Sequence, residues 1–400
     1  MRFYLRGFRI NRGTWLGVLV GLISFGVRFM VLKPNRLAGG TFFYTWEVLS
    51  GDLVAVLAVP WVLLLFLGIK RHTERFSETA GALAGVFTIV LVFVLWARAA
   101  ANLLESEPRI ARASMGFGSL GMILGAYVAA SSSLRHESVS GIWKNLIPLF
   151  GLAVLAVLFM SGFMSDLSVV KEFSVRKGRF LQEFGRHVVL CGFSVAAAVV
   201  IGIPLGLWAF RKSLFEKPIF FVVNTIQTVP SLALFGLMIA PLSILSHRFP
   251  LLRELGIKGV GTAPALIALS LYALLPITRN TYTSLKVLDP SVIEAAKGMG
   301  MGKLQMLMSV QIPLSLPIIL SGIRISTVQA IGNTTVAALI GAGGFGVFVF
   351  QGLGQAVPDL ILLGAVPVIL LAIFTDKLMA LLIRIITPEG IARQKTVSRR

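Results

Sequence analysis

The sequence predicts an all-α protein that crosses a membrane many times. Of its 400 residues, 56% are hydrophobic and only 14% are charged, and the mean hydropathy is +0.87. Soluble domains carry about 25% charged residues, so this composition excludes a water-soluble globule. The apolar residues also gather in runs of roughly 20, the length a helix needs to cross a bilayer.

About ten apolar runs predict as many transmembrane helices. They lie at 14–32, 53–69, 79–101, 113–134, 143–164, 187–210, 218–243, 259–279, 313–340 and 359–383. A basic stretch, MRFYLRGFRINR, precedes the first run, but no small-residue cleavage site follows it. We therefore interpret the first run as a retained anchor and not as a signal peptide.

The net charge of +20 predicts the orientation of the chain. Lys and Arg are spread over short loops without a basic face, which argues against binding to nucleic acid. The positive-inside rule places both chain termini in the cytoplasm of a multi-pass inner-membrane protein. The connection 165–186 is the main exception, because its basic residues fall outside. Its mixed pattern is typical of an amphipathic helix at the membrane surface.

The distribution of polar residues predicts a division of the chain at this connection. Residues 1–164 form an N-terminal membrane extension of about five helices with little polar content. Residues 165–186 form an external connecting segment, residues 187–384 form the core, and residues 385–400 form a basic cytoplasmic tail. Polar dipeptides and prolines concentrate in the core, so we expect the functional groups there.

A glycine-rich, partly charged segment, EAAKGMGMGKLQMLMSVQIP, interrupts the core. Asp289 as N-cap, Pro290 at the first helical position and Gly298 at the end predict one short helix. A second helix, over about 301–311, should close at Pro313. Two short helices rich in Met and Ala offer a surface that another protein can grip. The alternative is a longer loop folded over the helix ends.

This segment resembles the EAA loop of permease subunits of ATP-binding-cassette (ABC) importers. The residues that match the family pattern are Glu294, Ala295, Ala296, Gly300 and Pro313, and Gly298 lies between them. Val310 and Ile312 replace the isoleucine and leucine of the pattern. The resemblance implies that residues 287–313 dock into a cytoplasmic ATPase and transmit its closure to the membrane helices.

The same segment does not predict a nucleotide site. Lys297, just before GMGMGK (298–303), stands where a phosphate-binding loop needs glycine, and Leu304, just after it, stands where the loop needs Ser or Thr. One cysteine, Cys191, and four histidines at loop edges make no metal-ligand spacing. We therefore expect no catalytic residue, no metal and no cofactor in this chain. ATP and Mg would be bound by the partner ATPase.

Further strings resemble the permeases that import glycine betaine, choline and related osmoprotectants. They include GIPLGL (202–207), NTIQTVPSLALFGLMI (224–239) and GIRISTVQAIGNTTVAALIGAGGFG (322–346), and the extension resembles the long form of these permeases. The resemblance implies a five-helix type I core and a second permease copy or paralogue. It also implies cytoplasmic ATPase subunits and an external solute-binding protein.

The implied function is ATP-driven import of a quaternary-amine osmoprotectant such as glycine betaine. Alternatives are a permease for an amino acid or another choline-like nutrient, an ion-coupled secondary transporter, an intramembrane enzyme, or a regulatory membrane protein. A secondary transporter would need coupling-ion groups at mid-membrane. An enzyme would need paired carboxylates or a nucleophile and base within the spans.

Polar residues in two core spans are candidates for the solute route. They are Asn224, Gln227 and Thr228, and Asn333 and Thr334. Pro230 is expected to bend its helix, and Gly341, Gly343 and Gly344 to permit non-helical backbone at an outer gate. The alternative role for all of them is close helix packing. We interpret the intramembrane charges Arg324, Asp376 and Lys377 as snorkelling or paired groups, not as a proton path.

Overall fold

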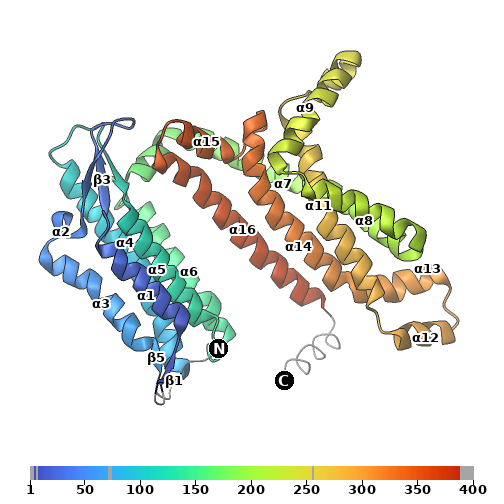
Figure 1. Cartoon of the computed structure of the whole chain (residues 1–400), viewed down its shortest axis with the longest axis horizontal. Helices are drawn as coiled ribbons and strands as arrows, with labels where there is room; N and C mark the ends of the chain where they lie inside the picture. The colour runs from blue at the N-terminus through green and yellow to red at the C-terminus, as the bar shows by residue number, and fades with distance from the viewer. Residues whose placement is uncertain (1–3, 6–7, 71–73, 255, 388–400) are drawn as a thin grey trace. The chain divides into compact units, whose positions relative to one another are not determined.

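The computed structural model of the chain describes residues 4–5, 8–70, 74–254 and 256–387 (Figure 1). The chain forms two compact units. Unit 1 comprises Met1–Val175 with Gln355–Asp359, and unit 2 comprises Arg176–Gly354 with Leu360–Arg400. From residue 388 onward, the predicted basic tail lies outside the described residues.

The predicted all-α polytopic fold is confirmed. Eight helical segments in the described part of the chain are long and apolar enough to cross a membrane. They are α4 (Glu74–Leu104), α5 (Phe117–Leu134), α6 (Gly141–Met160), α7 (Ser168–Arg211), α9 (Ser231–Arg248), α11 (Thr262–Lys286), the continuous run Lys303–Ile340 and α16 (Pro358–Ile386). Two shorter apolar helices, α1 (Arg12–Phe25) and α3 (Gly51–Leu67), correspond to the first two predicted spans.

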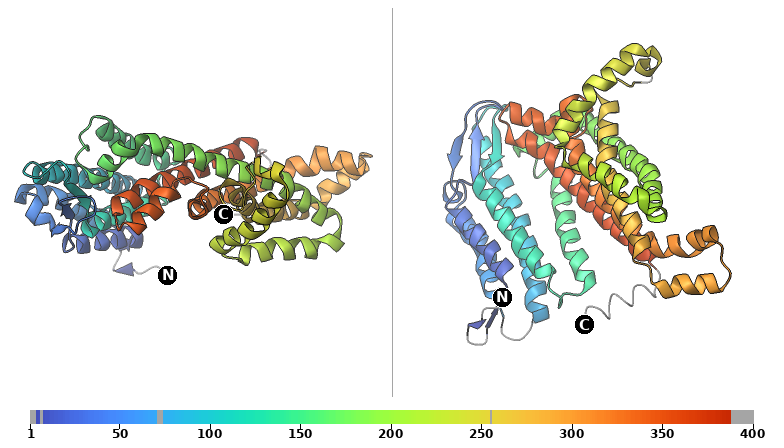
Figure 2. Two further views of the ribbon diagram at one scale, coloured as in Figure 1. Left: turned by 90° about the horizontal axis from the view of Figure 1, so that it is seen from above. Right: turned by 45° about the vertical axis from the view of Figure 1, so that its right-hand side comes forward.

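Unit 1 is a bundle of α1, α3, α4, α5 and α6 (Figure 2). Helix α5 packs against both α1 and α4, and α4 also contacts α3 and α6. Glycines permit the closest approach: a Cβ on Gly17 would lie only 2.4 Å from the carbonyl oxygen of Gly125. Small residues at such contacts let helix backbones approach closely in a membrane. Trp61, Trp96 and Met122 fill the core and are fully buried.

Two small antiparallel sheets join the connections of unit 1, and the sequence did not predict them. One sheet has the order β4 (Thr41–Phe43), β3 (Met30–Lys33), β6 (Arg112–Met115). The other has the order β1 (Tyr4–Leu5), β2 (Phe8–Ile10), β5 (Ile69–Lys70). A hydropathy window of about 19 residues cannot detect strands this short. The short helix α2 (Thr45–Val48) follows β4.

A polar cluster places Gln355–Asp359 in unit 1. The hydroxyls of Ser114 and Ser168 donate to Oδ2 of Asp359 over 2.6 and 2.8 Å, and all three side chains are buried. Arg36 lies 3.1 Å from the Glu172 carboxylate and donates to Oε1 of Gln355 over 2.8 Å. A buried carboxylate needs such donors. The cluster therefore ties the first turn of α16 to β6 and to the start of α7.

Unit 2 is built around the helix pair α11 and α14 (Ile312–Ala337). A Cβ on Gly322 of α14 would lie 2.8 Å from the carbonyl oxygen of Pro276 on α11, so these helices are in close contact. Helices α8 (Ser213–Thr228) and α9 pack against α11. The short helices of unit 2 include α10 (Pro250–Glu254), η2 (Ala338–Ile340) and α15 (Gly346–Gly354).

Helix α7 differs from the prediction for 165–186. That segment was expected as a separate surface helix, but from Ser168 it continues without a break into the next span. The helix has 44 residues, which corresponds to about 66 Å. That length is roughly twice the ~30 Å hydrocarbon core of a bilayer. Part of α7 must therefore extend beyond the hydrocarbon.

The predicted span 218–243 is divided, so the prediction that Pro230 merely bends its helix was wrong. Helix α8 ends at Thr228, and α9 starts at Ser231 in a different direction (Figure 1). Val229 between them is extended, with φ −70° and ψ 127°. Proline disfavours the helical conformation for the residue before it. This clash makes Val229 extended and so ends α8 at Thr228.

Candidate functional site

The EAA segment begins with helix α12 (Pro290–Gly298), as predicted. Oδ1 of Asp289 accepts a hydrogen bond from the backbone N–H of Ser291 over 2.9 Å and from its hydroxyl over 2.8 Å. These donors hold the pKa of the Asp289 carboxyl below its ordinary value. Asp289 therefore caps the helix.

Helix α12 ends at Gly298, as predicted, and Gly300 makes the turn that follows it. Gly298 is the last helical residue, whereas Gly300 has a φ of +79°. The N–H of Met301 donates to the carbonyl of Ala296 over 3.2 Å, and that of Gly300 to the carbonyl of Lys297 over 2.9 Å. This pair of bonds is a Schellman motif, which needs a left-handed residue at the position of Gly300.

The second helix of the segment does not close at Pro313 as predicted. Helix α13 (Lys303–Met306) passes through a π-helical turn, η1 (Leu307–Gln311), directly into α14. Proline lacks an N–H and its ring clashes with the carbonyl four residues earlier. The wider π turn lies where that clash would occur, so the helix continues. The segment is therefore joined rigidly to a membrane helix.

An exposed apolar surface covers these two short helices. Glu294 and Ala295 are exposed, whereas Ala296 is buried. Large apolar side chains around them are exposed: Met299 by 69%, Leu304 by 64% and Met308 by 57%. Apolar side chains this exposed beside Lys297 and Lys303 are typical of a protein-binding surface and untypical of a loop folded over helix ends.

The predicted route residues of α8 mainly bond within unit 2. Nε2 of Gln227 donates to the carbonyl of Tyr272 on α11 over 2.8 Å. The Thr228 hydroxyl donates to the carbonyl of Thr225 over 2.7 Å. Asn224 is half-buried. Gln227 therefore ties α8 to α11, while Asn224 keeps a partly open side chain.

The two predicted residues of α14 differ in their surroundings. Thr334 is buried, and its hydroxyl donates to the carbonyl of Ala330 over 2.8 Å and lies 3.1 Å from the sulfur of Cys191. Asn333 next to it is half-buried. The geometry favours the packing role for Thr334 and leaves Asn333 as the better candidate for contact with a solute.

The glycine run interrupts the helices at the end of α14. Gly341, Gly343 and Gly344 have φ of +81°, +86° and +83°, so the backbone here is non-helical, as expected. A Cβ on Gly343 would lie 2.9 Å from the Glu183 carboxylate, and one on Gly344 would lie 3.1 Å from Nδ1 of His187. The glycines therefore allow the loop to lie directly against α7.

Glu183 and His187 of α7 hold this loop, and the sequence analysis missed both. The Gly344 N–H donates to Oε2 of Glu183 over 2.7 Å, and the Phe345 N–H donates to Nδ1 of His187 over 3.3 Å. Nε2 of His187 lies 3.1 Å from the carbonyl of Ile331, so the imidazole is neutral with its proton on Nε2. A carboxylate and a histidine four residues apart share one helix face, and this spacing was the available signal.

Substituting Glu183 by alanine is expected to lower the free energy of unfolding by about 1–3 kcal/mol, because a buried N–H loses its acceptor. Glu183→Gln keeps an acceptor oxygen and should retain most of the stability and of the uptake. Gln182→Ala, at an exposed neighbouring position, is the control. Chemical denaturation of the purified chain measures the difference. Equal stability of the Glu183→Ala and Gln182→Ala variants would show that the loop does not depend on this bond.

A second polar site lies between α14 and α16. Nε and Nη2 of Arg324 donate to the two carboxylate oxygens of Asp376 over 2.6 and 2.7 Å. The pair borders a cavity of about 580 Å³ that Ser321, Ile325, Val328 and Gln329 also line. The charges are therefore paired, as interpreted from the sequence, but none of the predicted route residues lines this cavity.

Two family models match the chain, one in each half. Residues 198–388 match the binding-protein-dependent transport system inner membrane component. Residues 11–170 match the N-terminal domain of the ABC transporter permease YehY. The Bacillus subtilis (strain 168) glycine betaine/carnitine/choline transport system permease protein OpuCB is 39% identical over 221 residues, 55% of this chain and 94% of the relative. The chain belongs to this family of ABC permeases.

A second curated relative and a solved structure are also similar to this chain. The osmoprotectant import permease protein OsmW of Salmonella typhimurium (strain LT2) is 40% identical over 206 residues, 52% of this chain and 91% of the relative. Among solved structures, the MetNI methionine ABC transporter in an inward-facing conformation has a TM-score of 0.46 at 20% identity, covering 52% of this chain and 96% of that chain.

Family membership has direct consequences. The chain is the membrane-spanning permease subunit of an ABC importer and not an enzyme, because the ATPase of such importers is a separate subunit. It is a multi-pass membrane protein, consistent with the spans described above. The family also implies a solute-binding protein and a permease dimer as partners. The predicted resemblance to the long-form osmoprotectant permeases is confirmed.

Proposed function

We propose that the chain forms the translocation route of an importer for a quaternary-amine osmoprotectant such as glycine betaine, choline or carnitine. The names of several relatives, at 38–40% identity, support this class of solute. Glycine betaine and carnitine are methylated ammonium zwitterions and choline is a methylated ammonium cation. All three need a weakly polar route, because a strong fixed charge would trap them. The bidentate Arg324–Asp376 pair offers polar groups without net charge beside a cavity.

The exposed apolar surface around α12 and α13 is the observation that supports coupling of this permease to an ATPase. Met299 directly after α12, Leu304 on α13 and Met308 on the π turn η1 are exposed, and α13 continues through η1 into α14. An ATPase that grips this surface would move α14 directly. ATP and Mg bind to that ATPase, and the permease contributes Glu294, Ala295, Ala296, Gly298, Gly300 and Pro313 to the coupling loop.

The proposed route residues are the two half-buried asparagines. Asn224 and Asn333 contact the passing solute, while Gln227, Thr228 and Thr334 support the helices that carry them. Gly341, Gly343 and Gly344 form the outer gate, held by Glu183 and His187. This gate lies at the opposite end of α14 from the coupling loop (Figure 1), as an outer gate requires when the coupling loop is cytoplasmic.

We propose that both termini and the coupling loop are cytoplasmic. In a Cys191→Ala background, Ser291→Cys should react with a membrane-impermeant maleimide only after cells are permeabilised. Ser161→Cys, just after α6, should react in intact cells. Both serines are exposed, and Cys191 is the single cysteine. Labelling of residue 291 in intact cells would reverse the orientation and contradict the coupling role.

Uptake in reconstituted vesicles tests the function. The permease, its ATPase subunit and its binding protein are reconstituted, and labelled glycine betaine, choline, carnitine and an amino acid are compared with ATP inside and without it. We expect ATP-dependent uptake of at least one quaternary amine. ATP-dependent uptake of the amino acid alone would identify another solute. Uptake driven by an ion gradient without ATP would identify a secondary transporter.

A further inference from the structure

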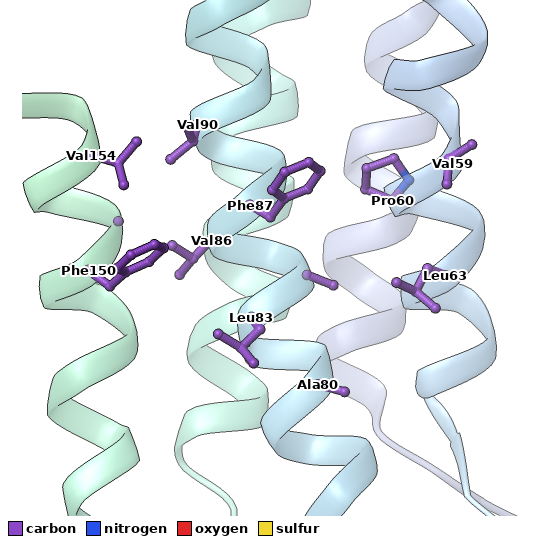
Figure 3. Close-up of a pocket in the computed structure, with 12 residues that line it drawn as sticks. Val59, Pro60, Leu63, Ala80, Leu83, Val86, Phe87, Val90, Phe150 and Val154 are labelled. Carbon is purple, nitrogen blue, oxygen red and sulfur yellow. The ribbon is translucent and has the colours of Figure 1, made fainter. Parts of the chain in front are cut away.

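The extension contains an apolar cavity between α3, α4 and α6 (Figure 3). Its volume is about 610 Å³, and its 12 lining residues include Leu63, Ala80, Phe87, Phe150 and Val154. All 12 are Val, Pro, Leu, Ala, Phe or Gly, so no lining side chain offers a hydrogen bond. A polar solute or an ion would lose its hydration there without compensation. The cavity suits only an apolar occupant.

The cavity borders the bilayer and has the depth of one leaflet. On α4 it extends from Ala80 to Val90, about 15 Å along the helix axis. That is half of a hydrocarbon core of about 30 Å. Only 11% of the span of α6 is buried, so the outer wall of the cavity is open to lipid. The apolar groups that can reach the cavity from the bilayer are therefore lipid acyl chains.

Positive charges lie at one end of the cavity. Arg75, at the start of α4, precedes Ala80 by about 7.5 Å along the helix axis, and Lys144, near the start of α6, precedes Phe150 by about 9 Å. Helices α4 and α6 run in the same direction past the cavity, with Ala80 and Phe150 toward the same end (Figure 3). Arg75 and Lys144 therefore flank the same mouth. Basic residues at this depth attract anionic lipid headgroups.

We propose that this cavity binds one acyl chain of a phospholipid from the leaflet at the N-terminal end of α4. The headgroup lies at Arg75 and Lys144, and an anionic headgroup is preferred. The chain fills the space between Phe87 of α4, Phe150 of α6 and α3. Bound in this way, the lipid completes the packing of α6, whose main helix contact in the described part of the chain is with α4.

A photoreactive lipid tests the proposal on the full chain. The permease is reconstituted in phosphatidylcholine and phosphatidylglycerol vesicles with a trace of phosphatidylglycerol that carries a diazirine in its acyl chain. After illumination, adducts are mapped by mass spectrometry. We expect adducts on 80–90 and 150–154 to exceed those on the exposed face of α9 by about fivefold, corresponding to about 1 kcal/mol. Uniform labelling of all lipid-facing segments would overturn the proposal.

Matched variants locate the occupant. Ala80→Phe fills the cavity, whereas Ala156→Phe adds the same side chain at an exposed position of α6 outside it. Ala80→Phe should abolish the excess labelling and Ala156→Phe should preserve it. Equal labelling of both variants contradicts the site. Absent labelling together with chain-to-chain cross-links through α6 would show that a second copy occupies it.

The headgroup preference has its own control. A phosphatidylcholine probe with the same diazirine should label the cavity less than the phosphatidylglycerol probe. The double variant Arg75→Gln, Lys144→Gln should remove that difference and leave acyl-chain labelling in place. Equal labelling of the unmodified chain by both probes would overturn the anionic preference.

Discussion

Gly300→Ala is expected to reduce osmoprotectant uptake about fivefold or more while the membrane helices stay folded. Gly300 has a φ of +79°, and a side chain in that conformation costs about 1–2 kcal/mol. A penalty of this size lowers the ratio of correctly turned loops to loops in other conformations by a factor of about 5–30. No atom lies within 4 Å of the position of an added Cβ, so strain in the turn is the only direct effect. Uptake and ATP hydrolysis are measured in the same vesicles.

Gly298→Ala is the matched control for this variant. It lies two residues earlier, has an ordinary helical φ, and also has open space around an added Cβ. Alanine favours a helix over glycine by about 1 kcal/mol, so α12 should be slightly more stable, and uptake should fall much less than in Gly300→Ala. Equal loss of uptake in both variants would show that the left-handed turn is irrelevant to coupling.

Breaking the Arg324–Asp376 pair is expected to lower the stability of the core. Asp376→Asn weakens two short charge-assisted hydrogen bonds and leaves the guanidinium without its counter-charge. Such bonds contribute about 1.5–3 kcal/mol when well shielded. The side chains are 35% and 41% exposed, so solvent reduces this to about 1–2 kcal/mol. Chemical denaturation in detergent measures the change.

A double-mutant cycle separates the pair from other effects of the substitutions. Arg324→Gln combined with Asp376→Asn removes both charges and should be more stable than the sum of the single changes, by about 1 kcal/mol. Arg384 is exposed on α16, the helix of Asp376. The control variant Arg384→Gln should leave the stability almost unchanged. Additive losses in the cycle would mean that the two side chains do not stabilise each other.

Local signals in the sequence predicted the start of a helix correctly where only residues next to it in the chain determine that start. Asp289 and Pro290 start a helix because a cap and a fixed φ act within a few residues. The effects of Pro230 and Pro313 on their helices differed from the prediction, because each effect depends on the backbone conformation of the preceding turn. Before Pro230 the extended Val229 ends the helix, whereas before Pro313 a π turn lets the helix continue.

Contacts between residues far apart in the chain could not be predicted from local sequence patterns. Glu183 and His187 act on a loop more than 150 residues away in the chain, and only the packing of α7 against that loop brings them together. The sequence correctly placed the end of α12 at Gly298, because a glycine there is a good stop signal, but it did not assign the left-handed turn to Gly300. The hydrogen bonds of Met301 and Gly300 show that the turn forms two residues later.

Photo-cross-linking from the coupling loop tests the central claim most directly. A photoreactive amino acid is placed at Leu304, exposed on α13, and at Leu353, exposed on α15, in separate samples of the complete transporter. The account predicts that Leu304 captures the ATPase subunit, that added ATP changes the yield, and that Leu353 does not capture it. No ATPase adduct at Leu304, or an equal adduct at Leu353, would contradict the account.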